Sequence, residues 1–473
     1  MVHGKQQEAH MKTRNPYLPS WEYVPDGEPH VFDGRVYVYG SHDRFNGCVF
    51  CLGDYVCWSA PIDDLGDWRY EGVIYEKTSD PYNRDGSMCL YAPDVTRGPD
   101  GRYYLYYVLD HVSIVSVAVC DKPAGKYEFL GYVHYPDGTL LGNRPGDEPQ
   151  FDPGVLTEGD KVYLYTGFCS PFDQGRHGAM ATVLRSDMLT VAQPPVFVVP
   201  GKPYSAGGEF EGHSFFEAPS IRKFGDTYYF IYSSEVMHEL CYATSKNPLG
   251  GFRYGGVLVS NADIGIGTYK PASLPVAFPA NNHGSVVQIG GDYYIFYHRH
   301  TNGTWYSRQG CAERLTMRAD GGFDQVEITS QGADGGPIPA KGEIPAYLSC
   351  VLFTEDRPGK FGDGCARITQ DGRDGDEEDT SYIAAVGNGT VMGFRYLACE
   401  GITRLTVTMR GYLNGSFELK NAIDGESLGS VKVCNANIWT PKSGEVTLPD
   451  DVHAIYLVFR GSGSGQVKSF RLD

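Results

Sequence analysis

The sequence lacks the features that mark several large classes of protein. Basic residues are in the minority, 40 Lys and Arg against 58 Asp and Glu, and the net charge is −18. Phosphate binding needs basic patches, so this balance argues against nucleic acid as a partner. No stretch approaches the roughly 20 apolar residues of a membrane-spanning helix, so we expect no membrane partner. The first fourteen residues are polar and contain no apolar signal region. This predicts a cytoplasmic protein, or a secreted one if a leader has been removed.

The usual motifs of nucleotide and acyl-transfer enzymes are missing as well. We find no phosphate-binding loop, no Gly-rich dinucleotide motif in a βαβ setting and no Gly-x-Ser-x-Gly elbow. The 12 cysteines are scattered; Cys48, Cys51 and Cys57 cluster, yet no second Cys/His pair gives zinc-ligand spacing. We therefore expect reduced thiols and a protein that requires no cofactor.

What the sequence does contain is one unit that recurs about every 60 residues. Each copy is a short apolar strand, a turn rich in Gly and Asp, and an aromatic strand, which is typical of a β-hairpin. A fixed period in this range indicates a solenoid, a propeller or an array. The five copies span residues 28–39, 92–107, 152–165, 218–232 and 283–297.

Two further strands follow the hairpin in several copies, and helical periodicity is nearly absent. Five units of about four strands predict an all-β chain with a five-bladed β-propeller over residues 15–331, after a disordered lead at 1–14. The Pro/Gly-rich stretch 332–345 is predicted to be a linker. Short alternating strands over 346–473 predict a β-sandwich of the jelly-roll kind. Within it the acidic run 369–379 is expected to form a loop, with calcium binding as an alternative.

A polar residue stands near the start of every copy, and these residues are Glu28, Asp94, Asp152, Glu217 and His283. The first strands of propeller blades surround a central channel, so their ends converge in space. Converging carboxylates are what glycoside cleavage needs: one carboxylic acid protonates the leaving oxygen while a second carboxylate activates water. Burial or a neighbouring carboxylate raises the pKa of the acid.

The segments 91–95 (Tyr-Ala-Pro-Asp-Val), 216–219 (Phe-Glu-Ala-Pro) and 282–286 (Asn-His-Gly-Ser-Val) resemble glycoside hydrolase family 43. The resemblance covers roughly residues 15–329. It implies a five-bladed propeller and an inverting exo-glycosidase that releases terminal α-L-arabinofuranose or β-D-xylose from plant-derived oligosaccharides. Two alternatives stay open, namely a related glycosidase for another furanose such as β-galactofuranose, and a non-catalytic sugar-binding propeller.

The same resemblance implies roles for three carboxylates. Glu217 matches the general acid, and Asp94 matches the third carboxylate, which orients that acid and raises its pKa. The general base falls within the segment 26–29, where the family usually has Asp before the Pro and this chain has Glu28. Glu28 is therefore the expected base, and Asp26 is the alternative.

Other positions are predicted to bind substrate. His283 matches a histidine near the channel axis that in some family members lies beside a metal ion or water, and Arg308 resembles an arginine that reaches the substrate. Asp152 matches the Asp-Pro of the third blade and is interpreted as structural rather than catalytic. Trp305 is expected to offer an aromatic face to the sugar, with His30 as a lesser pocket candidate.

The C-terminal part resembles a carbohydrate-binding module of family 6, through the segments 455–459 and 467–472. It is expected either to bind sugar or to buttress the propeller. The predicted partner is thus an oligosaccharide, with a structural Ca²⁺ as a possible addition.

Overall fold

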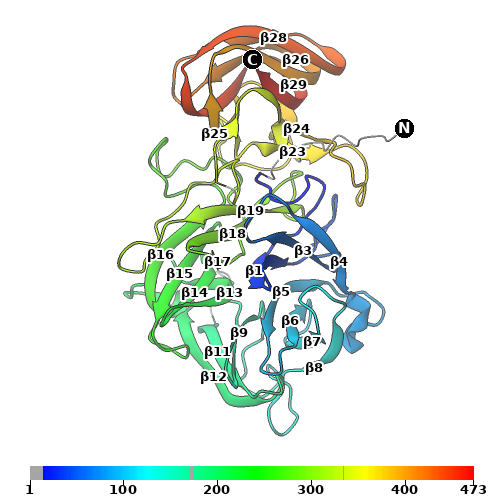
Figure 1. Cartoon of the computed structure of the whole chain (residues 1–473), viewed down its shortest axis with the longest axis vertical. Coiled ribbons are helices and arrows are strands. Elements are labelled where there is room, and N and C mark those ends of the chain that lie inside the picture. Colours follow the sequence, from blue (N-terminus) through cyan, green and yellow to red (C-terminus); the bar gives the residue numbers. More distant parts are fainter. Residues whose placement is uncertain (1–13, 171–174, 334) are drawn as a thin grey trace, which may run out of the picture.

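The computed structural model of the protein describes residues 14–170, 175–333 and 335–473. The lead predicted for residues 1–14 lies almost wholly outside the described residues. The chain forms a disc of radiating β-sheets with a second β-rich domain above it, coloured orange and red in Figure 1. The prediction of an all-β protein with a five-bladed propeller and a C-terminal sheet domain is confirmed.

The first four repeats each form a four-stranded antiparallel blade whose strands follow one another in chain order. The aromatic strand of each repeat is almost fully buried because it lies second in its blade and packs on both faces. The strands are β1 (Glu28–Phe32), β2 (Arg35–Tyr39), β3 (Tyr55–Pro61), β4 (Arg69–Tyr75), β5 (Leu90–Arg97), β6 (Tyr103–Leu109), β7 (Ser116–Cys120), β8 (Glu128–Tyr132), β9 (Gly154–Glu158), β10 (Lys161–Thr166), β11 (Gly178–Leu184), β12 (Val191–Pro200), β13 (Phe215–Phe224), β14 (Thr227–Ser234), β15 (Glu239–Ser245) and β16 (Arg253–Ser260).

The fifth blade has three strands, β17 (Val286–Ile289), β18 (Asp292–His300) and β19 (Arg308–Leu315), where four were predicted. The N-terminal segment covers the outer edge of β19. The Tyr17 amide donates to the carbonyl of Gly310 at 3.1 Å, and the Ala312 amide donates to Asn15 Oδ1 at 2.9 Å. Residues before the first repeat therefore satisfy the edge of the last blade and close the ring.

The first strands of the blades, β1, β5, β9, β13 and β17, surround the centre of the disc (Figure 1). Blades one and five meet there through a parallel bridge between Gly27 and Gly284. A Cβ added at Gly284 would lie 1.9 Å from the carbonyl oxygen of Phe296 on β18, so only glycine lets this segment pass so close to the second strand of its own blade. The ends of the five inner strands consequently come together at the axis.

The C-terminal domain is one ten-stranded sheet system dominated by two very long strands that pair with each other, β26 and β29. Its strands are β20 (Ile338–Pro339), β21 (Gly342–Pro345), β22 (Val351–Thr354), β23 (Arg367–Gln370), β24 (Ser381–Val386), β25 (Thr390–Cys399), β26 (Ile402–Lys420), β27 (Ser430–Val433), β28 (Ala436–Leu448) and β29 (Asp451–Leu472). β20 pairs with β25 and β21 pairs with β29, so the second half of the segment predicted as a linker belongs to this sheet.

The two domains share buried contacts. One apolar cluster contains Leu315 of β19 together with Val351 and Tyr456 of the C-terminal domain. Arg395, which is fully buried, donates from Nη2 to Asp263 Oδ2 of the propeller at 2.6 Å. An apolar core and a buried ion pair hold the domains in one orientation. In the part of the chain that the structure describes, no helix is both long and apolar enough to cross a membrane.

Candidate active site

A cavity of about 450 Å³ lies at the propeller axis, and its walls come from all five blades. Every blade contributes because the inner strand of each one begins at this opening. The lining residues are Asp26, Phe50, Cys51, Tyr91, Ala92, Phe151, Asp152, Phe168, Phe216, Glu217, Met237, Asn281, His283, Trp305, Tyr306 and Arg308.

Of the residues that the structure describes, three carboxylates line this pocket: Asp26 before β1, Asp152 before β9 and Glu217 on β13. Asp26 and Asp152 have backbone φ angles of 58° and 46°, in the left-handed region that L-residues seldom adopt. Such conformations cluster at functional sites, where the surrounding structure maintains them. Here they turn the two side chains into the cavity immediately before each inner strand begins.

Asp26 is held by a buried arginine. Arg308 donates from Nη1 to Asp26 Oδ1 at 2.8 Å. The same guanidinium donates from Nε to Asp43 Oδ2 at 2.8 Å and from Nη2 to Asp43 Oδ1 at 3.0 Å, so Asp43 grips it in a bidentate pair. Arg308 lies at the pocket, as predicted for a substrate-binding arginine, and it also fixes the orientation of a pocket carboxylate.

Glu217 and Asp152 are electrostatically linked. Enclosure by the protein, together with the nearby charge of Asp152, raises the pKa of Glu217 well above its usual range. Burial also raises the pKa of Asp152, to about 7. Asp152 Oδ2 accepts the amide of Ala218, the residue after Glu217, at 3.2 Å. Among the described residues none donates a hydrogen bond to the Glu217 carboxyl group, so its proton is available to a ligand in the pocket.

His283 is buried among three carboxylates. Its Nδ1 lies 3.7 Å from Asp152 Oδ2 and 4.0 Å from Asp26 Oδ1, and its Nε2 lies 3.7 Å from Glu28 Oε1. Burial alone would lower the pKa of His283, but Glu28, Asp152 and Asp26 outweigh it and raise the pKa to about 9. A protonated His283 therefore balances negative charge at the bottom of the pocket.

Glu28, the expected base, does not line the cavity. Its Oε2 accepts from Arg222 Nη2 at 2.5 Å and from the Ser220 hydroxyl at 2.9 Å. Burial opposes its ionisation, but Arg222 and then His283 lower its pKa. Glu28 thus links blade one to blade four below the pocket. Glu28 is 1% exposed and lies outside the cavity lining, whereas the alternative considered from the sequence, Asp26, lines the cavity.

Asp94 and His30 also lie outside the cavity lining. Asp94 Oδ2 accepts the amide of Val155 at 2.8 Å, and Oδ1 accepts the amide of Val95 at 2.8 Å and His30 Nε2 at 2.6 Å. Asp94 therefore connects blade two to blade three through backbone amides. Its position does not support the role of orienting Glu217, whereas Asp152, which the sequence led us to interpret as structural, contacts the backbone beside that residue.

The pocket walls are largely aromatic. Trp305 lines the cavity as predicted, and sequence reasoning missed Phe50, Tyr91 and Tyr306. It also missed two aromatic residues that directly precede pocket carboxylates, in the pairs 151–152 and 216–217. An aromatic residue before an acidic one at a blade start was a signal that the sequence offered.

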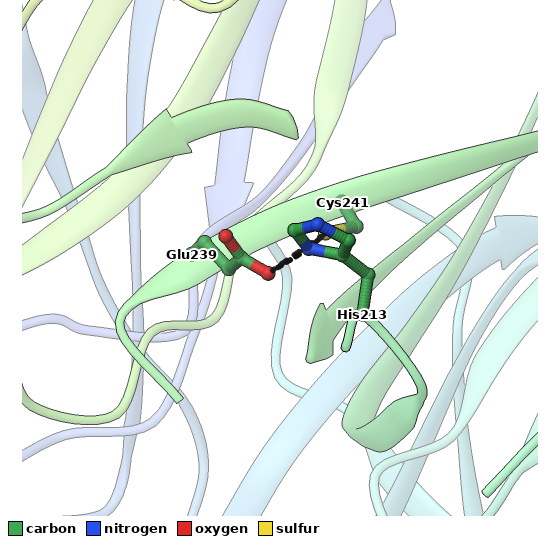
Figure 2. Close-up of side chains that lie close together, drawn as sticks. All are labelled: His213, Glu239 and Cys241. Atoms are coloured by element: carbon green, nitrogen blue, oxygen red, sulfur yellow. Dashed lines mark hydrogen bonds and ion pairs between the residues drawn. The ribbon is translucent and has the colours of Figure 1, made fainter. Parts of the chain in front are cut away.

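Within the described residues, two clusters carry the residue types that hold metal ions. One consists of His213, Glu239 and Cys241 and is drawn in Figure 2; the other consists of Glu28, His30 and Asp94. In the first, His213 Nδ1 donates to Glu239 Oε1 at 2.6 Å. Two ligands of one tetrahedral zinc ion would lie about 3.3 Å apart, given bonds near 2.0 Å. The cluster is therefore built as an ion pair with a neighbouring thiol.

A five-bladed propeller with three carboxylates at its axis, two of them with raised pKa values, has the site of an acid/base glycosidase. The chain belongs to glycoside hydrolase family 43, because residues 15–323 match the family model described as "Glycosyl hydrolases family 43". It is thus a glycoside hydrolase, and the resemblance expected from the sequence is confirmed.

Named relatives agree with this assignment. The chain is 62% identical over 465 residues to a protein of Thermoclostridium stercorarium named "Xylosidase/arabinosidase", covering 97% of this chain and 98% of that one. It is 31% identical to a protein of the same name from Bacteroides ovatus, over 61% of this chain and 89% of that one.

Solved structures agree as well. A family 43 β-xylosidase/α-arabinofuranosidase from a compost metagenome, solved with xylotriose, matches with a TM-score of 0.53 and 28% identity, over 67% of this chain and 97% of its own. A Bacillus subtilis arabinoxylan arabinofuranohydrolase solved with cellotetraose matches over 97% of both chains, with a TM-score of 0.52. At 21% identity this last match supports the two-domain fold alone.

Proposed function

We propose that the protein is an inverting exo-glycosidase that releases a terminal pentose from plant-derived oligosaccharides. The observation that carries this proposal is the presence of Asp26, Asp152 and Glu217 in one cavity, with the pKa of Glu217 raised. The inner end of the cavity is closed by side chains that solvent hardly reaches: Asp26, His283 and Arg308 are each at most 5% exposed. A pocket closed at its inner end suits a chain terminus better than the middle of a polymer.

The proposed mechanism uses two carboxylates and one water molecule. Asp26, oriented by Arg308, takes a proton from water, whose oxygen attacks the anomeric carbon. Glu217 gives its proton to the glycosidic oxygen as the bond from that oxygen to the anomeric carbon breaks. Asp152 keeps the pKa of Glu217 high and holds its backbone. The products are a sugar of inverted configuration and the shortened alcohol.

The sugar is proposed from the relatives. The two named relatives, 62% and 31% identical to this chain, carry the name xylosidase/arabinosidase, and the structure from the compost metagenome combines the same two activities. We therefore propose terminal α-L-arabinofuranose and β-D-xylose as substrates. The aromatic walls formed by Trp305, Phe50 and Tyr306 would contact the apolar faces of such sugars.

Family 43 hydrolysis requires no cofactor, and one solved relative is described as a calcium-free form. In this chain the residues at the channel fit Ca²⁺ poorly. Glu28 Oε1 is a buried oxygen without a hydrogen-bond partner, but Arg222 and a protonated His283 already bring two positive charges to that carboxylate. Ca²⁺ takes six to eight oxygen ligands. In the acidic run, Asp371, Asp374, Asp376 and Asp379 each accept a hydrogen bond, from Arg410, the amide of Phe45, the amide of Arg373 and the Ser20 hydroxyl respectively. These carboxylates are therefore not arranged around one common point.

We also infer a reducing compartment, consistent with the cytoplasmic location expected from the sequence. All 12 cysteines are free thiols, and Cys51, Cys57 and Cys241 are buried. Comparing activity and thermal stability with and without a strong reductant checks this inference.

A panel of nitrophenyl glycosides tests the proposed function. Hydrolysis of the α-L-arabinofuranoside or the β-D-xyloside, with proton NMR showing the inverted anomer first, supports it. Hydrolysis of the β-galactofuranoside alone would assign the related furanosidase. Calorimetric binding of oligosaccharides without any turnover would assign a sugar-binding propeller instead.

A further inference from the structure

Two loops of the propeller form one wall of the pocket. The blade-1 loop (residues 43–51) supplies Phe50 and Cys51, and the blade-5 loop (residues 301–307) supplies Trp305 and Tyr306. The rings of Phe50 and Tyr306 meet edge to face at 4.8 Å. The Asn302 side-chain amide donates to Asn46 Oδ1 at 2.8 Å, so the two loops are also joined by a hydrogen bond.

The C-terminal domain holds both of these loops, although it supplies no residue to the pocket lining. The loop between β23 and β24 (residues 371–380, the acidic loop) reaches blade one, where Asp374 Oδ1 accepts the amide of Phe45 at 2.8 Å. Asp374 Oδ2 lies 3.5 Å from Arg44 Nη1. That ion pair is exposed and therefore weak, so the amide hydrogen bond carries most of the contact.

β23 holds the blade-5 loop in a similar way. The Asn302 amide donates to the carbonyl of Ile368 at 2.6 Å, and the Thr369 hydroxyl donates to Asn302 Oδ1 at 2.7 Å. Asn302 has a φ of 56°, a conformation that its neighbours must stabilise. Its side chain thus accepts from Thr369 while it donates to Asn46. The C-terminal domain therefore holds the pocket wall through two contacts, one from the acidic loop to Phe45 and one from the end of β23 to Asn302; we call this pair of contacts the grip.

The contact between Asp374 and the blade-1 loop is linked to the proposed catalytic base, because the same loop contains Asp43. Asp43 begins the blade-1 loop, and its carboxylate holds Arg308 and accepts the Cys51 amide at 2.9 Å. Arg308 in turn holds Asp26, the proposed base, and its guanidinium lies 4.8 Å from the ring centre of Phe50. A displacement of the loop would move the wall and Arg308 together.

We propose that Asp374 and Thr369 of the C-terminal domain are positioning residues for substrate binding, acting through the blade-1 and blade-5 loops. This inference rests on the proposed glycosidase function. It gives the C-terminal domain a part in the reaction that does not require the domain to bind sugar itself. The domains share an apolar cluster and a buried ion pair, so we treat these contacts as part of a fixed interface and not as a gate.

Paired substitutions in the full-length protein test the inference. Asp374→Ala and Thr369→Val, alone and together, remove the two side-chain contacts. Asp374→Asn and Thr369→Ser keep an acceptor for Phe45 and a hydroxyl donor for Asn302. Asp424→Asn, at an exposed carboxylate between β26 and β27, is the matched control. The measurements are kcat and KM on the aryl pentoside that the wild type cleaves, and the thermal unfolding midpoint.

We expect the double removal to raise KM about tenfold with a smaller change in kcat, because a wall misplaced by about an ångström weakens binding of the sugar. The conservative pair and Asp424→Asn should retain the wild-type KM. An unchanged KM in the double variant, or a loss of activity that only follows the unfolded fraction, would overturn the proposal.

Hydrogen exchange without substrate separates this inference from the proposed function. In the double variant, peptides covering 43–51 and 301–307 should exchange faster than in the wild type, while strands elsewhere in the propeller keep their protection. This holds even if the wild type cleaves none of the glycosides tested, an outcome that would reject the function alone. Wild-type exchange in both loops of the double variant would reject the grip.

Discussion

Arg308 and Asp26 form an ion pair at the inner end of the pocket, with 2.8 Å between Nη1 and Oδ1 and both side chains almost fully buried. Asp43 holds the other face of the guanidinium. The Arg308–Asp26 pair lines the pocket, whereas Glu28 lies outside the pocket lining and is paired with Arg222. This relationship moves the proposed base two residues towards the N-terminus from the position that the family pattern suggested.

Replacing each candidate base separates the two carboxylates. Asp26→Asn should lower kcat/KM by about a thousandfold, within the range of general-base contributions. It should lower the unfolding midpoint less than Glu28→Gln does, because Arg308 keeps its bidentate pair with Asp43. Glu28→Gln should leave turnover by the folded enzyme close to wild type. It should lower the free energy of unfolding, by up to about 3–5 kcal/mol, because Arg222 loses its charge partner in a buried site. Steady-state kinetics beside thermal unfolding give both results; the reverse pattern would restore Glu28 as the base.

The general acid makes a different prediction, which depends on the leaving group. Glu217→Gln removes the proton that the glycosidic oxygen needs, so hydrolysis of oligosaccharides should fall by about 10²–10⁴. Substrates with an acidic leaving group, such as dinitrophenol, need little protonation and should retain most of their rate. Parallel assays on xylobiose and the dinitrophenyl glycoside measure this contrast. Equal losses on both would indicate that Glu217 acts in some other way.

The fold could be predicted from the sequence more fully than the site. Period, turn residues and aromatic strands together indicate a propeller, because each repeat forms one blade by local pairing. The choice between Asp26 and Glu28, or between Asp94 and Asp152, depends on backbone angles at the blade starts, and no residue type specifies these. The positive φ of Asp26 and Asp152 turns them into the cavity, while Asp94 bonds to the amides of the neighbouring blade.

The contacts of the C-terminal domain with the pocket loops could not be predicted from the sequence either. Asp374 lies in an acidic run whose composition suggested a loop or a calcium site, and its actual partner is the amide of Phe45, 329 positions away. Long-range backbone contacts of this kind leave no local pattern. The sequence did indicate that the domain would either bind sugar or buttress the propeller.

Removal of divalent metal provides a further test. Arg222 and protonated His283 neutralise the buried carboxylates at the channel, so a bound cation has little to add. Dialysis against a strong chelator should leave kcat/KM and the unfolding midpoint unchanged, and added Ca²⁺ should have no effect. As a control, Arg222→Met removes one of the two positive charges and should make stability sensitive to Ca²⁺. A fall in wild-type activity on chelation, restored by Ca²⁺, would show that the channel holds the ion after all.

The pH dependence should respond in opposite directions to two substitutions around Glu217. Turnover needs Glu217 protonated, so kcat/KM falls as the pH rises through the raised pKa of this residue. After burial, the negative charge of Asp152 is the main cause of that rise, while the positive charge of His283 lowers the same pKa.

Asp152→Asn should therefore move the alkaline limb of the kcat/KM profile to lower pH, by about one pH unit for a single nearby charge. His283→Gln should move it to higher pH by a similar amount, because the positive charge of His283, whose own pKa is raised to about 9, lowers the pKa of Glu217. Profiles of both variants and of Asp424→Asn, which should match the wild type, measure the shifts. If the alkaline limbs of Asp152→Asn and His283→Gln moved in the same direction, the assignment of Glu217 as an acid whose pKa is set by Asp152 and His283 would be contradicted.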